Sequence, residues 1–594
     1  MAAGPASASL RHPPRCGWGP LPHPRAGAET PEPPDSGFVL VWMALMITAL
    51  IGMAGLAIDV ANWYFQAQRQ QKAADAAALA GAVFLPADVT QSYSTANTLA
   101  NRNGYMTGVA STTVSPQQES KPTRLRVTIT RDVDNFFGGI LGVATTTIRR
   151  TSVAEFAGPV PMGSPSNVFG NEPAPDGTWS SVTGNSSFWV NVAGAQTTKV
   201  SGDQHQAGVC ASTVDGCSAG TNVDYFSLSG ALDPQYQGYF YNVRVNNPPI
   251  GQKLAIEVFD PAFVQVGDTC NDSFLDSALA IDPARYAKGP GSPFCTGDHK
   301  INASCSPPDV SCLPVTTFTF RAPDSTPWSL TDNPIISTGA CSTRTFQPFQ
   351  GNLGPKISGD PTFASYFRKW VRVCEVPATD VQSYLASVGG TYADFLVQLR
   401  TNASTNNQTA AGAGHNRLSM RAALIDSAGA VAGTRVSVNA SQTMAIYANA
   451  QGADTRFYLA RVLPGADGQV LNLKFFDIGD ASVVSCGSPP CSAAGVLTVL
   501  PPAEYAPSFG NCTYTPPGST AFVTMPGCSV TSNSTFNGKL IQVRIPLPNG
   551  YTCDTTSVTG CWVKIRYTFP STVQASDTTT WSASIEGDPV RLVE

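Results

Sequence analysis

The strongest constraint on this chain is an uninterrupted run of 21 uncharged, mainly apolar residues from Phe38 to Ile58. At 1.5 Å per residue, a helix of this length covers about 30 Å, the thickness of the hydrocarbon core of a bilayer. The run therefore predicts one transmembrane helix. A cleaved signal peptide is the alternative, but its apolar region would be shorter, about 7–15 residues, and no convincing small-residue cleavage site precedes Asp59.

Residues 1–37, before this run, are rich in proline and lack apolar periodicity. They predict a disordered tail. A substrate of a prepilin-type peptidase is a further alternative for this end of the chain. Against it, Trp42 stands where such substrates usually carry a glutamate.

Cysteines indicate which side of the membrane the larger part of the chain occupies. Cys16 precedes the apolar run and the other fourteen cysteines follow it. An even number of cysteines in Gly- and Pro-rich sequence favours disulfides in an oxidising compartment, so we expect the C-terminal part outside and Cys16 as a free thiol inside. Pairing each cysteine with the next predicts seven bridges: Cys210–Cys217, Cys270–Cys295, Cys305–Cys312, Cys341–Cys374, Cys486–Cys491, Cys512–Cys528 and Cys553–Cys561.

An alanine-rich segment, Asp59–Leu85, follows the apolar run and predicts an outward continuation of the same helix. Small residues recur every seven positions at Ala67, Ala74 and Gly81. Such a stripe lets another helix approach closely. The alternative is an alanine-rich face that packs within its own domain, and the sequence does not decide between the two.

Two motifs in this region resemble a known family. Gly55-Leu56-Ala57-Ile58-Asp59 is followed by Gln71-Lys72-Ala73-Ala74-Asp75-Ala76-Ala77-Ala78-Leu79-Ala80. Together they resemble the N-terminal signature of TadG-like proteins of the bacterial Flp (tight adherence) pilus machinery. The resemblance extends over residues 37–157 and departs from the family pattern at Gln70, where leucine is usual.

The resemblance implies a protein anchored in the bacterial cytoplasmic membrane, with its bulk exported and with envelope or pilus-assembly proteins as partners. The family-motif residues are Gly55, Asp59, Gln71 and Asp75. For the two acids we expect structural roles: Asp59 hydrated at the membrane surface, and Asp75 paired with Lys72 on the helix surface. Many relatives carry a von Willebrand A domain downstream, but its Asp-x-Ser-x-Ser metal loop does not occur here.

Beyond residue 160 the chain changes character. Charged residues are only 13% of the whole chain, and Gly and Pro number 53 and 47. Short alternating apolar segments between turns predict antiparallel strands in two-sheet sandwiches. The ladder 238–260 matches the ladder 456–477, and both end in Phe-Asp, which predicts a duplicated module.

Catalysis and nucleic-acid binding find little support. The net charge of −5 offers no basic excess for phosphates. We find no G-x-S-x-G motif, no phosphate loop and no Cys/His pair outside the expected disulfides, and Asp203 beside His205 is a chance-level coincidence. Asp260, Asp477 and Asp480 at strand ends are weak calcium candidates, with solvated turn acids as the preferred interpretation.

The predicted fold is an N-terminal transmembrane helix that continues into an α-helical stalk with a small α+β region, then two duplicated, mainly-β sandwich modules of jelly-roll-like type. The expected boundaries are 1–37 (cytoplasmic tail), 38–58 (membrane helix), 59–157 (TadG-like stalk), 158–400 (first module) and 401–594 (second module). The predicted function is non-enzymatic, in Flp/Tad-type pilus assembly, adhesion or surface scaffolding. The alternative is an anchored or secreted carbohydrate-binding or carbohydrate-processing protein, whose exposed tryptophans would stack on sugars. Neither requires a cofactor.

Overall fold

The computed structural model describes only part of the chain. The described residues are 36–85, 89–120, 123–156, 160–170, 188–218, 220–226, 238–265, 298, 313–324, 330, 332–337, 339–350, 365–366, 369–388, 392–401, 412–433, 435–451, 454–479, 481–483, 494–505, 507–569, 573–586 and 590–593. They divide into two compact units, one formed by residues up to Phe65 with Val133–Thr146, the other by Gln66–Asp132 with Thr147–Glu594.

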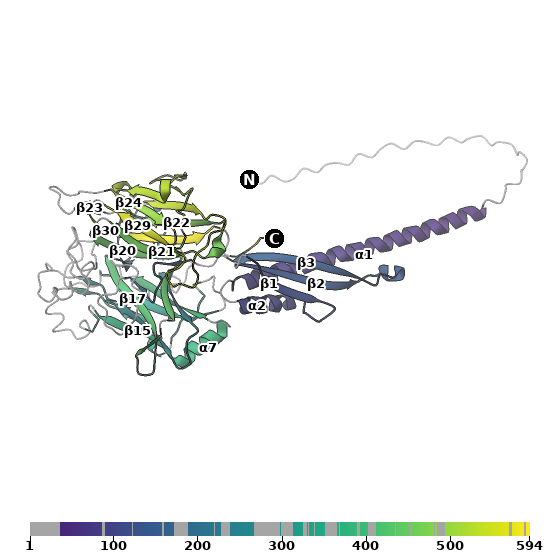
Figure 1. Ribbon diagram of the computed structural model, residues 1–594, viewed down its shortest axis with the longest axis horizontal. Coiled ribbons are helices and arrows are strands. Elements are labelled where there is room, and N and C mark those ends of the chain that lie inside the picture. The colour runs from purple at the N-terminus through teal and green to yellow at the C-terminus, as the bar shows by residue number, and fades with distance from the viewer. Residues whose placement is uncertain are drawn as a thin grey trace, which may run out of the picture. The chain divides into compact units, whose positions relative to one another are not determined.

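Helix α1, Ser36–Ala82, is the long apolar helix that the sequence predicts (Figure 1). Its segment Phe38–Ala82 is long and apolar enough to cross a membrane. Most side chains of the predicted span are exposed, but Gly55 and Asp59 are buried. The reason is that both contact residues 136–138, which lie against this side of the helix.

The second unit begins with a small α+β region that contains the rest of α1 and helix α2, Val89–Arg102. Its sheet has the order β1-β2-β3-β31. The bounds of these strands are Thr113–Gln118 for β1, Arg124–Asp134 for β2, Thr145–Phe156 for β3 and Val590–Leu592 for β31. The end of the chain thus returns to this sheet, where β31 pairs antiparallel with β3, which the sequence did not predict.

The alanine stripe of α1 packs inside this region. Ala74, Ala77 and Ala78 are fully buried in a cluster with Leu125 and Val127 of β2. Small side chains let the helix axis approach a sheet closely, so no second protein is required to explain the stripe. Of the two alternatives left open by the sequence, packing within the domain is the one observed.

Eight strands form the first sandwich. One sheet has the order β6-β17-β10-β15 and the other β9-β16-β12-β13. The bounds are Phe188–Ala193 (β6), Tyr239–Asn246 (β9), Lys253–Phe259 (β10), Thr316–Arg321 (β12), Arg344–Phe346 (β13), Trp370–Val376 (β15), Tyr392–Thr401 (β16) and His415–Ile425 (β17). In chain order the sheets read 1-8-3-6 and 2-7-4-5, which is a jelly roll.

The second sandwich repeats this order. Its sheets are β20-β30-β22-β28 and β21-β29-β24-β27. The bounds are Thr443–Gln451 (β20), Asp454–Arg461 (β21), Val470–Phe476 (β22), Gly495–Leu500 (β24), Ser529–Ser532 (β27), Leu540–Pro546 (β28), Trp562–Thr568 (β29) and Val573–Ile585 (β30). The two ladders matched in the sequence are β9–β10 and β21–β22, which occupy the same positions in the two jelly rolls. The predicted fold class is confirmed.

The two jelly rolls share their sheets. Strand β6 of the first pairs with β20 of the second. In the other sheet β19, Val436–Ser441, and β4, Pro161–Met162, lie between β9 and β21. Strand β17 follows residue 401 in the chain, yet it pairs with β10 of the first jelly roll. The expected boundary between residues 400 and 401 would separate these two strands, so we propose a boundary at Gln442 instead.

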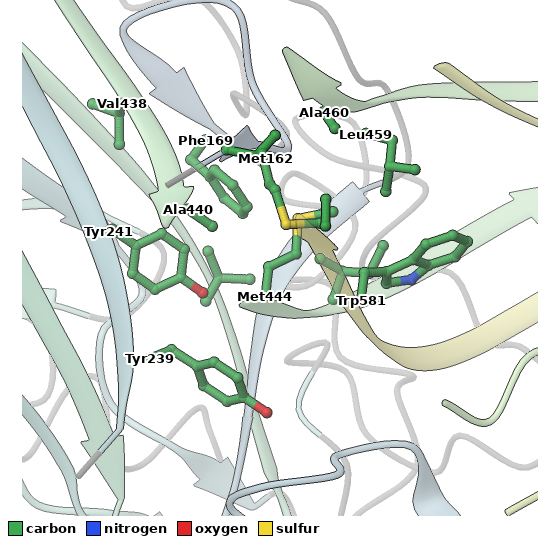
Figure 2. Close-up of a cluster of buried hydrophobic side chains, with 14 of the residues drawn as sticks. Met162, Phe169, Tyr239, Tyr241, Val438, Ala440, Met444, Leu459, Ala460 and Trp581 are labelled. Carbon is green, nitrogen blue, oxygen red and sulfur yellow. The ribbon is translucent and has the colours of Figure 1, made fainter. Parts of the chain in front are cut away.

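One hydrophobic core continues through both jelly rolls. Figure 2 shows its central part, where Met162 of β4 lies near Met444 of β20, with Tyr241 of β9 and Trp581 of β30 nearby. All four are 0% exposed. Burial of aromatic and sulfur-containing side chains from both modules joins them into one folding unit.

Candidate functional site

The family-motif residue Asp59 holds the turn between β2 and β3. Its carboxylate accepts backbone N–H groups from Phe136 at 2.7 Å, Phe137 at 3.0 Å and Gly138 at 2.7 Å. The 3-10 helix Gly138–Leu141 begins at this point, so the negative charge satisfies N–H groups that have no partner within that helix. Asp59 is 1% exposed, and the expectation that it is hydrated is therefore wrong.

Gly55 and Trp63 lie one helical turn on either side of Asp59 and contact the same turn. A Cβ atom added at Gly55 would lie 2.7 Å from Cγ of Phe137, so only glycine leaves room for that ring. Trp63 Nε1 donates to Asn135 Oδ1 at 2.7 Å. Residues four apart lie on one face of a helix, so one face of α1 contacts the turn through Gly55, Asp59 and Trp63.

Farther along α1, a glutamine pair attaches the helix to the sheet. Gln71 Nε2 donates to Asp75 Oδ1 at 2.8 Å and to the carbonyl of Thr151 at 3.1 Å. Among the described residues no ion pair joins Asp75 to Lys72, so the expected surface pair is replaced by this hydrogen bond. Gln70, where the chain departs from the family pattern, is buried and donates to the carbonyls of Ile129 and Ile148 at 2.6 and 2.9 Å.

Asp260 and Asp477 occupy equivalent places in the two jelly rolls, at the ends of β10 and β22. Both have positive φ, 56° and 63°, and both are 1% exposed. Their N–H groups donate to the carbonyls of Lys369 and Lys539, each directly before the neighbouring strand. Aspartate tolerates this backbone region better than most residues, so the shared Phe-Asp ending shapes a turn.

These two acids are buried and do not lie in a solvated rim. Asp480 lies outside the described residues. Within the described part of the chain, the group with metal-like spacing is Glu504 with Cys553 and Cys561. Because the two cysteines form a disulfide, their sulfurs are not thiolate ligands, and this group does not suit a metal. Calcium binding stays an untested prediction.

The described residues contain four disulfides, and each joins the cysteines that sequential pairing predicts. They are Cys210–Cys217, Cys341–Cys374, Cys512–Cys528 and Cys553–Cys561. Cys341, Cys374, Cys512 and Cys528 lie in the hydrophobic core. The expected pairs Cys270–Cys295, Cys305–Cys312 and Cys486–Cys491, and the free thiol Cys16, lie outside the described residues.

A buried polar cluster surrounds Asp203, whose adjacency to His205 was expected to be a coincidence. Asp203 is fully buried and accepts hydrogen bonds from the Tyr239 hydroxyl and from the N–H groups of Ala193 and Gln206. Burial raises the pKa of Asp203, and these bonds only partly offset it. His205 stacks on Phe226 with ring centroids 4.8 Å apart.

A pH prediction follows from His205, because burial lowers the pKa of its imidazole below the ordinary value. The unfolded chain then takes up the proton first, so the stability due to His205 is present above about pH 6.5 and is lost as the pH falls below it. We expect the thermal midpoint of the wild type to fall more than that of His205→Gln between about pH 7.5 and about pH 5.5. Equal decreases would contradict this assignment.

Tryptophan placement bears on the sugar-binding alternative. Trp189, Trp562 and Trp581 are among the largest fully buried side chains, at 0%, 2% and 0% exposed. Trp370 is half-buried beneath the guanidinium of Arg421, 4.1 Å from the ring centroid. Trp328 lies outside the described residues. The described tryptophans on strands thus serve packing, as alternating strands favour.

One protein-family model matches part of the chain. Residues 37–83 match the family model described as putative Flp pilus-assembly TadE/G-like. This confirms the predicted resemblance over the segment that contains all four family-motif residues. No curated protein matches the chain. The solved structure of the Faustovirus major capsid protein aligns over 82% of this chain and 80% of its own, at 8% identity and a TM-score of 0.13. A score this low does not indicate a shared fold.

Proposed function

We propose, with the TadE/G-like segment at residues 37–83 as the premise, that this chain is a non-enzymatic, single-pass envelope protein of the Flp/Tad pilus machinery. Helix α1 would anchor it in the bacterial cytoplasmic membrane, and the fused jelly rolls would form the ectodomain. The observation that carries the proposal is the family match on a helix that has the length and apolar character of a membrane span. Its role would be assembly, adhesion or surface scaffolding together with other envelope proteins.

The disulfides support export of the ectodomain. Four bridges occur in the described parts of the two jelly rolls, and disulfides persist in oxidising compartments outside the cytoplasm. All eight of these cysteines follow α1 in the chain. We therefore propose that the N-terminus is inside and the C-terminal part outside.

The sugar-binding alternative has less support. Recognition of sugars by stacking requires exposed aromatic rings, and Trp189, Trp562 and Trp581 are enclosed in the core. The non-enzymatic assignment rests on the family match. The sequence patterns, which include no recognised catalytic motif, agree with it. The exposed faces of the sheets are left as surfaces for protein partners.

Gene deletion tests the proposal directly. In the source bacterium we expect loss of this gene to reduce surface pili or pilus-dependent attachment, counted by electron microscopy and by adhesion to a surface. Complementation with the full chain should restore both, whereas a chain truncated after residue 157 should restore neither if the ectodomain is required. Normal pili and normal attachment in the deletion strain would overturn the proposal.

A further inference from the structure

The turn between β2 and β3 exposes an unusual amount of apolar surface. Phe136 is 66% exposed, Ile140 and Leu141 are each 82% exposed, and Val143 is 55% exposed. The sequence carries no charge from Asn135 to Ile148. We call residues 135–144 the apolar tip. Contiguous exposed side chains of this size mark a surface that meets something apolar.

The apolar tip lies against the membrane-spanning part of α1. Asp59 binds its backbone, and the ring of Phe137 lies where a Cβ atom of Gly55 would be. Gly55 is four residues, or about 6 Å along the helix, inside the apolar run measured from Asp59. The tip therefore extends beside residues that face lipid when α1 spans a bilayer.

The backbone of the apolar tip is largely satisfied without water. Asp59 accepts the N–H groups of residues 136–138, and the remaining bonds close the turn on itself. These are Asn135 N–H to Ala144 O, Ile140 N–H to Phe137 O, Gly142 N–H to Gly139 O, Val143 N–H to Gly138 O, and Asn135 Nδ2 to Val143 O. Unsatisfied backbone groups oppose the entry of irregular segments into lipid, so these bonds lower the cost of placing the turn there.

Aromatic residues mark the expected level of the membrane surface on the same helix. Tyr64 and Phe65, five and six residues after Asp59, are 68% and 58% exposed. Aromatic side chains gather at the boundary between lipid and water. The first charged residue after Asp59 is Arg69. The boundary thus falls between Asp59 and Arg69, and the apolar tip lies on its lipid side.

We propose that the apolar tip inserts into the bilayer leaflet next to Asp59 and forms a second lipid contact beside α1. The partner is the acyl-chain and glycerol region of the lipids, because the tip continues the apolar surface of the span and carries no charge for headgroups. The insertion fixes the rotation of α1 about its axis and the level of Asp59 in the membrane. This inference rests on the proposed role of α1 as a membrane anchor.

Spin-label accessibility tests the insertion in the full chain, reconstituted in phosphatidylethanolamine/phosphatidylglycerol nanodiscs. A nitroxide is attached through a non-canonical amino acid at Leu141, at Ile47 in the middle of the span, and at exposed Val558 in the second jelly roll. We expect the label at Leu141 to resemble the label at Ile47, accessible to oxygen and shielded from a water-soluble nickel chelate. The label at Val558 should show the reverse.

Two glycine variants of α1 provide a matched pair. Gly55→Leu places a side chain where the Phe137 ring lies, so the Leu141 label should become accessible to nickel. Gly52→Leu, with nothing within 4 Å of its added Cβ, should leave the label shielded.

The possible outcomes are distinct. Nickel accessibility at Leu141 with a shielded Ile47 would overturn the insertion and leave the anchor intact. Nickel accessibility at both positions would overturn the anchor as well. Low accessibility to both reagents at Leu141, with dipolar broadening between labels, would mean that a second copy of the chain covers the tip, and would also overturn the lipid contact.

Discussion

Asp59→Ala is expected to release the turn between β2 and β3 from α1. The substitution removes a carboxylate that accepts three backbone N–H groups, and hydrogen bonds to a charged acceptor are each worth about 1.5–3 kcal/mol. Loss of even two of them predicts roughly a 100-fold or greater rise in the opening of the turn, since 1.4 kcal/mol corresponds to a factor of ten. Hydrogen–deuterium exchange of peptides covering residues 133–146 measures this opening in nanodiscs.

Two variants make the measurement specific. Asp75→Ala removes the same side chain from the same helix but loses only the hydrogen bond from Gln71, so the peptides covering 133–146 should be unchanged. Asp59→Asn keeps one uncharged oxygen acceptor and should give intermediate protection. Unchanged protection in Asp59→Ala would mean that the turn is held by Gly55 and Trp63 without Asp59.

Helix α1 and the repeated strand pairs were predictable because their signals are local. The apolar run predicted α1. The duplication was predicted because the pair β9–β10 and the pair β21–β22 have the same alternation of apolar and polar residues and a similar turn. Sequential cysteine pairing was correct at the four described bridges because each joins residues close in the chain. The order of the strands within each sheet was not predicted, because it depends on pairing between segments that are far apart in the sequence.

The site was harder to predict because its partners are far apart in the sequence. Asp59 and Phe136 are separated by 77 residues. The motif that contains Asp59 gives no indication that this carboxylate accepts hydrogen bonds from so distant a turn. The uncharged stretch after Asn135 is the one local signal of an apolar surface at this turn. The return of β31 to β3 was likewise hidden, because three residues make too short a strand to stand out.

Removal of Glu257 alone is expected to destabilise the fold strongly, because this side chain pairs with two arginines inside the first jelly roll. Glu257 on β10 lies directly opposite Arg421 on β17 and Arg372 on β15. Arg421 Nη2 donates to Glu257 Oε2 at 2.7 Å, and Arg372 Nη2 donates to Oε1 at 3.0 Å. The Arg421 side chain is only 2% exposed and the Glu257 side chain 9%.

Glu257→Ala leaves the buried guanidinium of Arg421 without its carboxylate. Breaking a buried ion pair by removing one partner costs about 3–5 kcal/mol, because the remaining charge loses the stabilisation that the carboxylate gave it in the interior. We expect the free energy of unfolding of the fused jelly rolls to fall by that amount. Guanidinium unfolding with the disulfides intact, followed by tryptophan fluorescence and by protection from proteolysis, measures the decrease.

The internal repeat supplies the control. The residue of the second jelly roll that corresponds to Glu257 is Lys474, which is exposed on β22. Lys474→Ala should therefore change stability by no more than about 0.5 kcal/mol. A double variant, Glu257→Met with Arg421→Met, removes both charges together and should recover most of the loss. A loss in the double variant as large as in Glu257→Ala would show that side-chain packing, and not the unpaired charge, sets the cost at this position.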